Sequence, residues 1–437
     1  MTERFEYKGR WWVPENPDYE VPGLIKYSPE SGITLELIGQ FKPNKDKIMP
    51  GNGSPTIING YASNNKLFTL IDCRISFYQY NPNLPITNYH CGSMICGSEC
   101  FSNKSEIRFR EIVVSIQFLN DWVQLNSGFH VEYQLGKSDC KIEYNKPKAI
   151  SLKLGTHCEL SLIPCVRFPV IISNNKATIE QNVNLCISQD YYVQFGTLIN
   201  KVLCFQHLLV IFLQRFPSLL KVTFYRDKKV KAQDQYEYYF GQNFAEDTDK
   251  KLQWFDMLLD YQYIEPDFSS IVTKWYSEYK GLLNIYIPYF HSLSKELNLN
   301  DTYLNICRAI EAFGRHCLVA KSKSKKSKLK LGKAIVYLYN QYKDSMDQVL
   351  SINYILRFAR KVTKYRNDLT HANPIISKQD KNFKKTYDMI EQLRAFLTIA
   401  LLRYHGVSSN TLKHSLNNSY IYSYLRMKKK EKEKEKS

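Results

Sequence analysis

The segment KYRNDLTHANP (residues 364–374) places an arginine, an amide and a histidine near the end of a helical pattern. Upstream, apolar residues recur three or four positions apart, which is the spacing of one buried stripe on a helix. These residues are Ile355, Phe358, Val362, Tyr365 and Leu369. Pro374 disfavours helical geometry in the residue before it, so we expect the helix to end near Ala372.

The polar residues of this segment occupy defined positions around the predicted helix. Arg366 lies on the shoulder of the apolar stripe, while Asn367 and His371 lie nearly opposite its centre and are neighbours, four residues apart. An arginine binds phosphate oxygens through a planar, permanently charged group, and a histidine transfers protons near neutral pH. Together they suit RNA cleavage in which the 2′-hydroxyl attacks the adjacent phosphate, a reaction that requires no metal or other cofactor. The alternative is a solvated histidine at a helix end with an ordinary arginine nearby.

The period of the hydrophobic pattern changes along the chain. Short alternating segments such as ITLELIG (residues 33–39) fill the first 190 residues, and helical spacing follows from about Tyr191. We therefore predict an α+β, multidomain fold with a β-rich, sandwich-like or barrel-like N-terminal domain and a C-terminal α-helical bundle. The expected boundaries are 1–190 for the β-rich domain, 191–250 for a helical connector with a polar linker, 251–407 for the helical bundle, and 408–437 for a C-terminal segment ending in a disordered Lys/Glu tail.

Lysines supply much of the formal net charge of +18. The run KSKSKKSKLKLGK (residues 321–333) contains no acid, and clustered lysines favour a polyanion such as RNA. A mobile, solvated loop is the alternative. The lysines that we expect to contact RNA are Lys321, Lys323, Lys325, Lys326, Lys328 and Lys330.

Cysteine usage and hydropathy favour a cytoplasmic protein. The 11 cysteines are an odd number and no secretory leader precedes them, so reduced thiols are expected. The longest apolar run, at residues 202–213, is too short for a membrane span and is interpreted as a buried helix. His90, Cys91, Cys96 and Cys100 are ligand types that zinc accepts, but their spacing is not that of a standard pair, and Gly-Ser steps indicate a flexible loop between strands. We predict no metal site.

The order of several segments resembles the ApeA-type HEPN family. RNDLTH (residues 366–371) matches its R-polar-x3-H signature, and LNICRAIEAFGRH (residues 304–316) resembles the helix that carries an acidic residue, here Glu311. Residues 255–282 resemble the lead-in to that domain. The stretches at residues 5–39 and 118–129, together with LFTLIDC, look like the ApeA N-terminal domain.

The resemblance implies an antiphage abortive-infection protein in which an N-terminal sensing domain precedes a HEPN ribonuclease. Its partners would be RNA, including tRNA, a second copy of the chain in a homodimer, and a phage-derived trigger. By position, Arg366 would hold phosphate, His371 would handle the proton, Asn367 would orient the histidine, and Glu311 would tether Arg366. Glu311 has a structural alternative, a salt bridge with Arg308 or Arg315 on its own helix.

Two classes of function therefore remain open from the sequence. The first is a metal-independent HEPN endoribonuclease with its catalytic residues at Arg366, His371, Asn367 and Glu311. The second is a non-catalytic nucleic-acid-binding or dimerisation module joined to a β-rich ligand-sensing domain.

Overall fold

The computed structural model describes residues 4–41, 55–63, 65–79, 81, 85–125, 128–133, 140–173, 176–227, 235–242, 250–293, 297–322, 329–350, 355–371 and 379–434. The chain divides into two compact units. The first comprises Met1–Gln206 with Pro217–Lys251, and the second comprises His207–Phe216 with Leu252–Ser437.

The first unit is built from strands. They are β1 (Phe5–Trp12), β2 (Val21–Ser28), β3 (Gly32–Ile38), β4 (Ile57–Ala62), β5 (Leu67–Gln79), β6 (Ile86–Gly97), β7 (Arg108–Ile116), β8 (Phe129–Tyr133), β9 (Cys140–Tyr144), β10 (Ile150–Lys153), β11 (Cys158–Ser173), β12 (Lys176–Gln194), β13 (Leu219–Tyr225) and β14 (Gln235–Phe240). A short helix, α1 (Leu119–Val123), follows β7.

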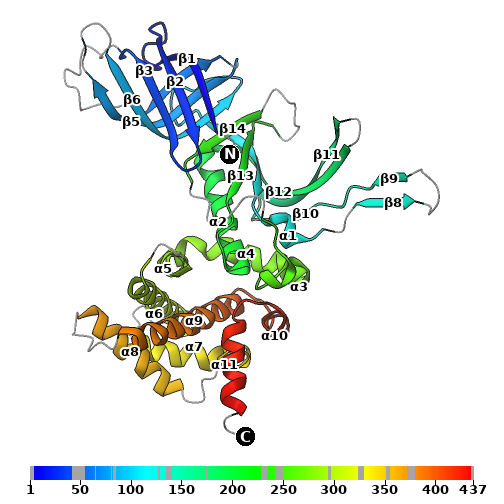
Figure 1. The fold of residues 1–437 in the computed structure, drawn as a ribbon, viewed down its shortest axis with the longest axis vertical. Helices are drawn as coiled ribbons and strands as arrows, with labels where there is room; N and C mark the ends of the chain where they lie inside the picture. The colour runs from blue at the N-terminus through cyan, green and yellow to red at the C-terminus, as the bar shows by residue number, and fades with distance from the viewer. Residues whose placement is uncertain are drawn as a thin grey trace. The chain divides into compact units, whose positions relative to one another are not determined.

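The first six strands close into an antiparallel barrel (Figure 1). Around the ring the order is β6-β3-β2-β1-β4-β5, and β5 pairs with β6 to complete it. Alternate side chains point inward and form one buried cluster that includes Trp11, Ile25, Leu35 and Phe68. Gly60 allows the close packing, because an added Cβ would lie 2.2 Å from Cε3 of Trp11. The predicted barrel-like N-terminal domain is confirmed.

The sheet extends from β6 in the order β14-β13-β7-β12-β11-β10, and β8 and β9 pair in a separate two-stranded sheet. The helix expected within residues 191–250 is present as α2 (Phe195–Leu213), but the segments that flank it belong to the sheet and do not form a separate connector. β12 continues to Gln194, and β13 and β14 return into the sheet by pairing with β7 and β6. Because the first unit includes Pro217–Lys251, the β-rich domain is longer than 190 residues.

The second unit is helical. Its elements are α2 (Phe195–Leu213, from His207 onward), η2 (Trp254–Asp256), α3 (Tyr261–Ile264), η3 (Glu265–Asp267), α4 (Phe268–Glu278), η4 (Tyr279–Leu282), α5 (Leu283–Leu293), α6 (Leu299–Ser322), α7 (Leu331–Met346), α8 (Ile355–Thr370), α9 (Gln379–Tyr404), α10 (Ser409–Asn418) and α11 (Ser423–Lys434). α9 ends before Gly406, whose φ of 105° lies in the left-handed region, as expected for a helix C-cap.

The expected disordered tail is helical as far as the structure describes it, to Lys434. Tyr422 and Leu425 are buried, and Lys428 forms an ion pair with Asp388 of α9. Alternating Lys and Glu are also good helix formers, so a charge run that suggests a solvated tail here continues a packed helix.

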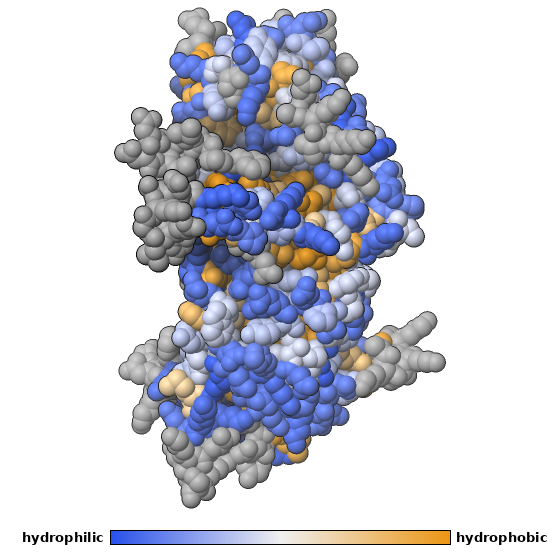
Figure 2. Space-filling model, turned by 90° about the vertical axis from the view of Figure 1, so that its right-hand side faces the viewer, coloured by the Kyte–Doolittle hydropathy of each residue, from blue (hydrophilic) through white to orange (hydrophobic). Residues whose placement is uncertain are grey.

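Among the described residues, α2 is the one helix long and apolar enough to cross a membrane by length and composition. Its side chains from Leu208 to Leu213 are buried in the fold, which is the packing of a core helix. Elsewhere, Figure 2 shows hydrophobic surface gathered over part of the face that it presents. Val131 and Ile142, paired across the β8–β9 hairpin of the first unit, are both exposed.

Candidate functional site

α8 carries the arginine and the histidine of the sequence motif. The helix ends at Thr370, and His371 forms the following turn, with its N–H donating to the Asn367 carbonyl over 3.0 Å. The expected end near Ala372 lies outside the described residues. The His371 side chain is exposed, whereas the Arg366 side chain is 28% exposed. One helix end thus presents a shielded cation and an accessible imidazole.

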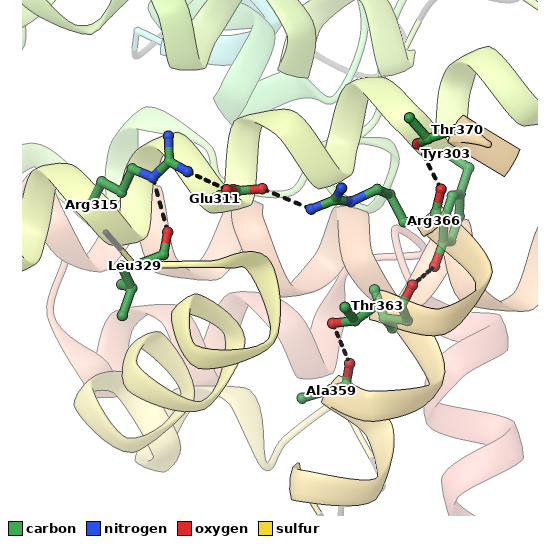
Figure 3. A network of polar contacts seen from close by, with 9 residues as sticks. Tyr303, Glu311, Arg315, Leu329, Ala359, Thr363, Arg366 and Thr370 are labelled. Carbon is green, nitrogen blue, oxygen red and sulfur yellow. Dashed lines mark hydrogen bonds and ion pairs between the residues drawn. The ribbon is translucent and has the colours of Figure 1, made fainter. Parts of the chain in front are cut away.

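Glu311 of α6 contacts two arginines at once (Figure 3). Its Oε2 lies 3.2 Å from Nη2 of Arg366, and its Oε1 pairs with Arg315 one turn along α6. Arg315 also donates through Nε to the Leu329 carbonyl over 2.9 Å. The two geometries considered for Glu311, a tether to Arg366 and a salt bridge on its own helix, therefore occur together.

Tyrosines fix α8 against α6 beside this ion pair. The buried Tyr303 donates its hydroxyl to the Val362 carbonyl over 2.9 Å, and its ring meets Tyr365 edge-on at 4.9 Å. Burial raises the pKa of the Tyr303 phenol and that of the Cys307 thiol, the latter to about 12, so both groups stay neutral at physiological pH. Arg366 therefore lies beside uncharged, tightly packed side chains, and Glu311 is its anionic partner.

The helical projection placed Asn367 beside His371 on the face of α8 opposite the apolar stripe, and the structure shows a further neighbour on that face. Asn367 is half-buried and lines a groove between α7 and α8. Within the described residues, the Asn367 amide makes no hydrogen bond with the His371 ring. The helical projection of α8 could not include α7, which packs on this side of the helix.

The lysines expected to contact RNA are only partly described. Lys323, Lys325, Lys326 and Lys328 lie outside the described residues. Lys321 lies in the last turn of α6, and Lys330 is exposed at the start of α7. The run therefore connects α6 to α7.

His90, Cys91 and Cys96 lie in β6, so the expected flexible loop is wrong. Strand alternation places His90 on the outer face and the Cys91 thiol in the barrel core. Burial raises the pKa of Cys96 to about 12. Among the described residues no group of three or more His, Cys, Asp or Glu side chains has a geometry that could hold a metal ion.

Sequence reasoning missed the groove and the role of Arg315 in bridging Glu311 to the start of α7. The sequence feature that could have indicated the groove is Gly332, the second residue of α7. An added Cβ there would lie 3.0 Å from Oγ1 of Thr363, so a glycine permits close approach of α7 and α8.

Comparison with known proteins identifies both halves of the chain. The model of the family ApeA N-terminal domain 1 matches residues 6–275, and that of Apea-like HEPN matches residues 304–411, a span that contains Glu311, Arg366 and His371. No curated protein and no solved structure gives a significant match. HEPN domains are typically ribonucleases, so the second match supports a nuclease-like role at the family level. The chain belongs to the ApeA family, with an ApeA N-terminal domain 1 followed by an Apea-like HEPN domain.

Proposed function

We propose that this chain is a metal-independent endoribonuclease whose active site is built from Arg366, His371, Asn367 and Glu311. The observation that carries the proposal is the ion pair between Glu311 and Arg366, which fixes a guanidinium on the helix whose end carries the exposed His371 imidazole. Such a pair provides the two requirements of RNA cleavage, a fixed positive charge at the phosphate and a group that transfers protons.

The reaction begins with attack of the ribose 2′-oxygen on the adjacent phosphorus, and the 5′-oxygen of the next nucleotide leaves. Arg366 neutralises the charge that develops on the non-bridging oxygens. The 2′-hydroxyl loses a proton and the leaving 5′-oxygen gains one, and His371 transfers one of these protons while solvent exchanges the other. Glu311 acts as a positioning residue for Arg366. The backbone carbonyl of Asn367 accepts the His371 N–H and so fixes the turn that carries His371.

The biological setting that we propose goes beyond the family-level nuclease role. We place the enzyme in the cytoplasm as a homodimer in which two motifs face a shared RNA, with the β-rich unit sensing a phage-derived trigger. Abortive infection would result when the activated enzyme cleaves cellular RNA.

The test compares two exposed histidines in the helical unit. His371→Ala should abolish cleavage of a mixed RNA substrate in a metal chelator, and His291→Ala, at the last turn of α5, should leave it unchanged. Equal cleavage by the wild type and by His371→Ala would contradict the proposal. It would favour the alternative, a nucleic-acid-binding or dimerisation module.

A further inference from the structure

The groove between α7 and α8 has a volume of about 720 Å³. This lies within the range of roughly 300–1,000 Å³ typical of small-molecule sites. Its apolar lining comes from both helices, with Val336 and Tyr337 on α7 and Leu356 and Ala359 on α8. Leu356 is 59% exposed although it borders this hollow. The groove is thus an open surface that a flat apolar group can cover.

The Tyr337 ring has a fixed place in this wall. Its hydroxyl donates to the Cys317 carbonyl of α6 over 3.4 Å, which anchors the far end of the side chain. An aromatic ring held in this way offers a preorganised surface for stacking, and nucleobases stack on aromatic side chains irrespective of base identity.

Charges surround the apolar lining. Lys333, Arg360 and Lys364 are exposed and line the groove, and Asp368 supplies the one carboxylate of the lining residues. The excess of cations favours an anionic occupant. A second copy docking here across a two-fold axis would place the same three cations against their equivalents, so charge disfavours self-association through this groove.

The groove also adjoins the proposed catalytic segment. Asn367 lines it, follows Arg366 in α8, and accepts the N–H of His371. At the other side, α7 begins just after Lys330, at the end of the lysine-rich run. A nucleic-acid strand carries an apolar base and a phosphate at each nucleotide. It therefore matches both the apolar lining of the groove and the cations around it.

We infer that this groove binds one nucleotide of single-stranded RNA next to the cleaved bond. The base packs on Val336, Tyr337 and Leu356, and the phosphates contact Lys333, Arg360 and Lys364. This inference rests on the proposed function and names its substrate as single-stranded RNA, because a base within a duplex is stacked and cannot enter the groove.

Binding is measured on the full chain with a fluorescent single-stranded oligoribonucleotide carrying 2′-O-methyl groups, which cannot be cleaved by 2′-hydroxyl attack. Lys364→Glu should raise Kd about tenfold at low salt and flatten its salt dependence. The matched control is Lys361→Glu, a lysine on the same helix that is also exposed but does not line the groove, and its effect should be several-fold smaller.

A second variant tests the base-binding wall. Val336→Trp fills the groove, and it should raise Kd while leaving the thermal unfolding temperature within a few degrees of the wild type. The inference is overturned if Lys364→Glu and Lys361→Glu weaken binding equally, or if Val336→Trp binds like the wild type. It is also overturned if duplex RNA binds as tightly as the single strand, or if Leu356→Glu converts a dimer to a monomer.

These outcomes are separable from failure of the proposed function. Cleavage that depends on His371 but is unaffected by Lys364→Glu and Val336→Trp would reject the groove and retain the nuclease. Groove-dependent binding without any cleavage by the wild type, in an extract of phage-infected cells that supplies the trigger, would reject the nuclease.

Discussion

Glu311 and Arg366 lie 55 positions apart in the chain and meet as an ion pair, with 3.2 Å between Oε2 and Nη2. Both side chains are mostly shielded, at 19% and 28% exposure, so solvent screens this pair less than a surface pair. Arg315 occupies the other carboxylate oxygen. The pairing gives Arg366 a defined direction, and two predictions about catalysis follow from it.

Replacing Glu311 tests its role in positioning. Glu311→Ala should lower kcat for RNA cleavage about tenfold or more, because Arg366 loses its anchor. Arg315→Ala leaves the Arg366 contact in place and should reduce kcat much less. The conservative Glu311→Asp should recover part of the activity, which a purely structural loss would not predict. Equal losses for Glu311→Ala and Arg315→Ala, with unfolding temperatures equally lowered, would assign Glu311 to stability alone.

Arg366→Lys keeps the charge and removes the planar fork. We expect kcat to fall by about 100-fold, since one lost transition-state donor typically costs that much. Steady-state kinetics on one oligoribonucleotide would measure it, with circular dichroism to verify the fold. Activity of Arg366→Lys within a factor of three of the wild type would argue against phosphate contact by this side chain.

His405 makes the stability of the helical unit depend on pH. This residue is 3% exposed, and its Nε2 lies 2.8 Å from the hydroxyl oxygen of Tyr286. Burial, and to a smaller extent the charges of Lys274 and His316, lowers the pKa of His405 to about 3. The unfolded ring has a pKa of about 6.5. The stability contribution is therefore complete above about pH 6.5 and declines by up to about 1.4 kcal/mol per pH unit as the pH falls toward 3.

Urea unfolding at pH 7.5 and pH 5 would measure this dependence. His405→Gln should flatten it, and His291→Gln, at an exposed site, should not. Some dependence should survive in His405→Gln because burial also lowers the pKa of His207, to about 4. An unchanged pH dependence in His405→Gln would show that the buried His405 is not its source.

Because the closed barrel is tightly packed around Gly60, we expect Gly60→Ala to lower the stability of the fold. The added Cβ would overlap the Trp11 ring, and overpacking of this kind typically costs about 1–3 kcal/mol. Gly196→Ala is the matched control, since nothing lies within 4 Å of an added Cβ in that helix. Near-UV circular dichroism during thermal unfolding would report on the Trp11 environment. If both variants melt alike, the barrel interior is not packed around Trp11.

Regular periodicity made much of the fold predictable. The alternation around Leu35 and the three-and-four spacing around Val362 gave the correct element types. The error at residues 191–250 has a physical origin: a polar stretch between two strands has the same composition whether it links domains or closes a hairpin. Only the non-local pairing of β13 with β7 and of β14 with β6 distinguishes them.

The sequence predicted only the part of the candidate site that lies within a single helix. Spacing alone put Arg366 and His371 on one helix end, because both belong to one local element. Whether Glu311 reaches Arg366 as well as Arg315 depends on how α6 and α8 pack, which the sequence of neither helix contains. The groove was missed for the same reason, since it belongs to two helices at once.

The central claim is that the RNA's own 2′-hydroxyl is the nucleophile at a site made by Arg366 and His371. Mass spectrometry of an oligoribonucleotide cut by the purified chain in a metal chelator tests it most directly. We predict 2′,3′-cyclic phosphate and 5′-hydroxyl ends, and no cleavage at a linkage whose 2′-hydroxyl is replaced by hydrogen. Products with 3′-hydroxyl and 5′-phosphate ends, or cleavage at the 2′-deoxy linkage, would contradict the account.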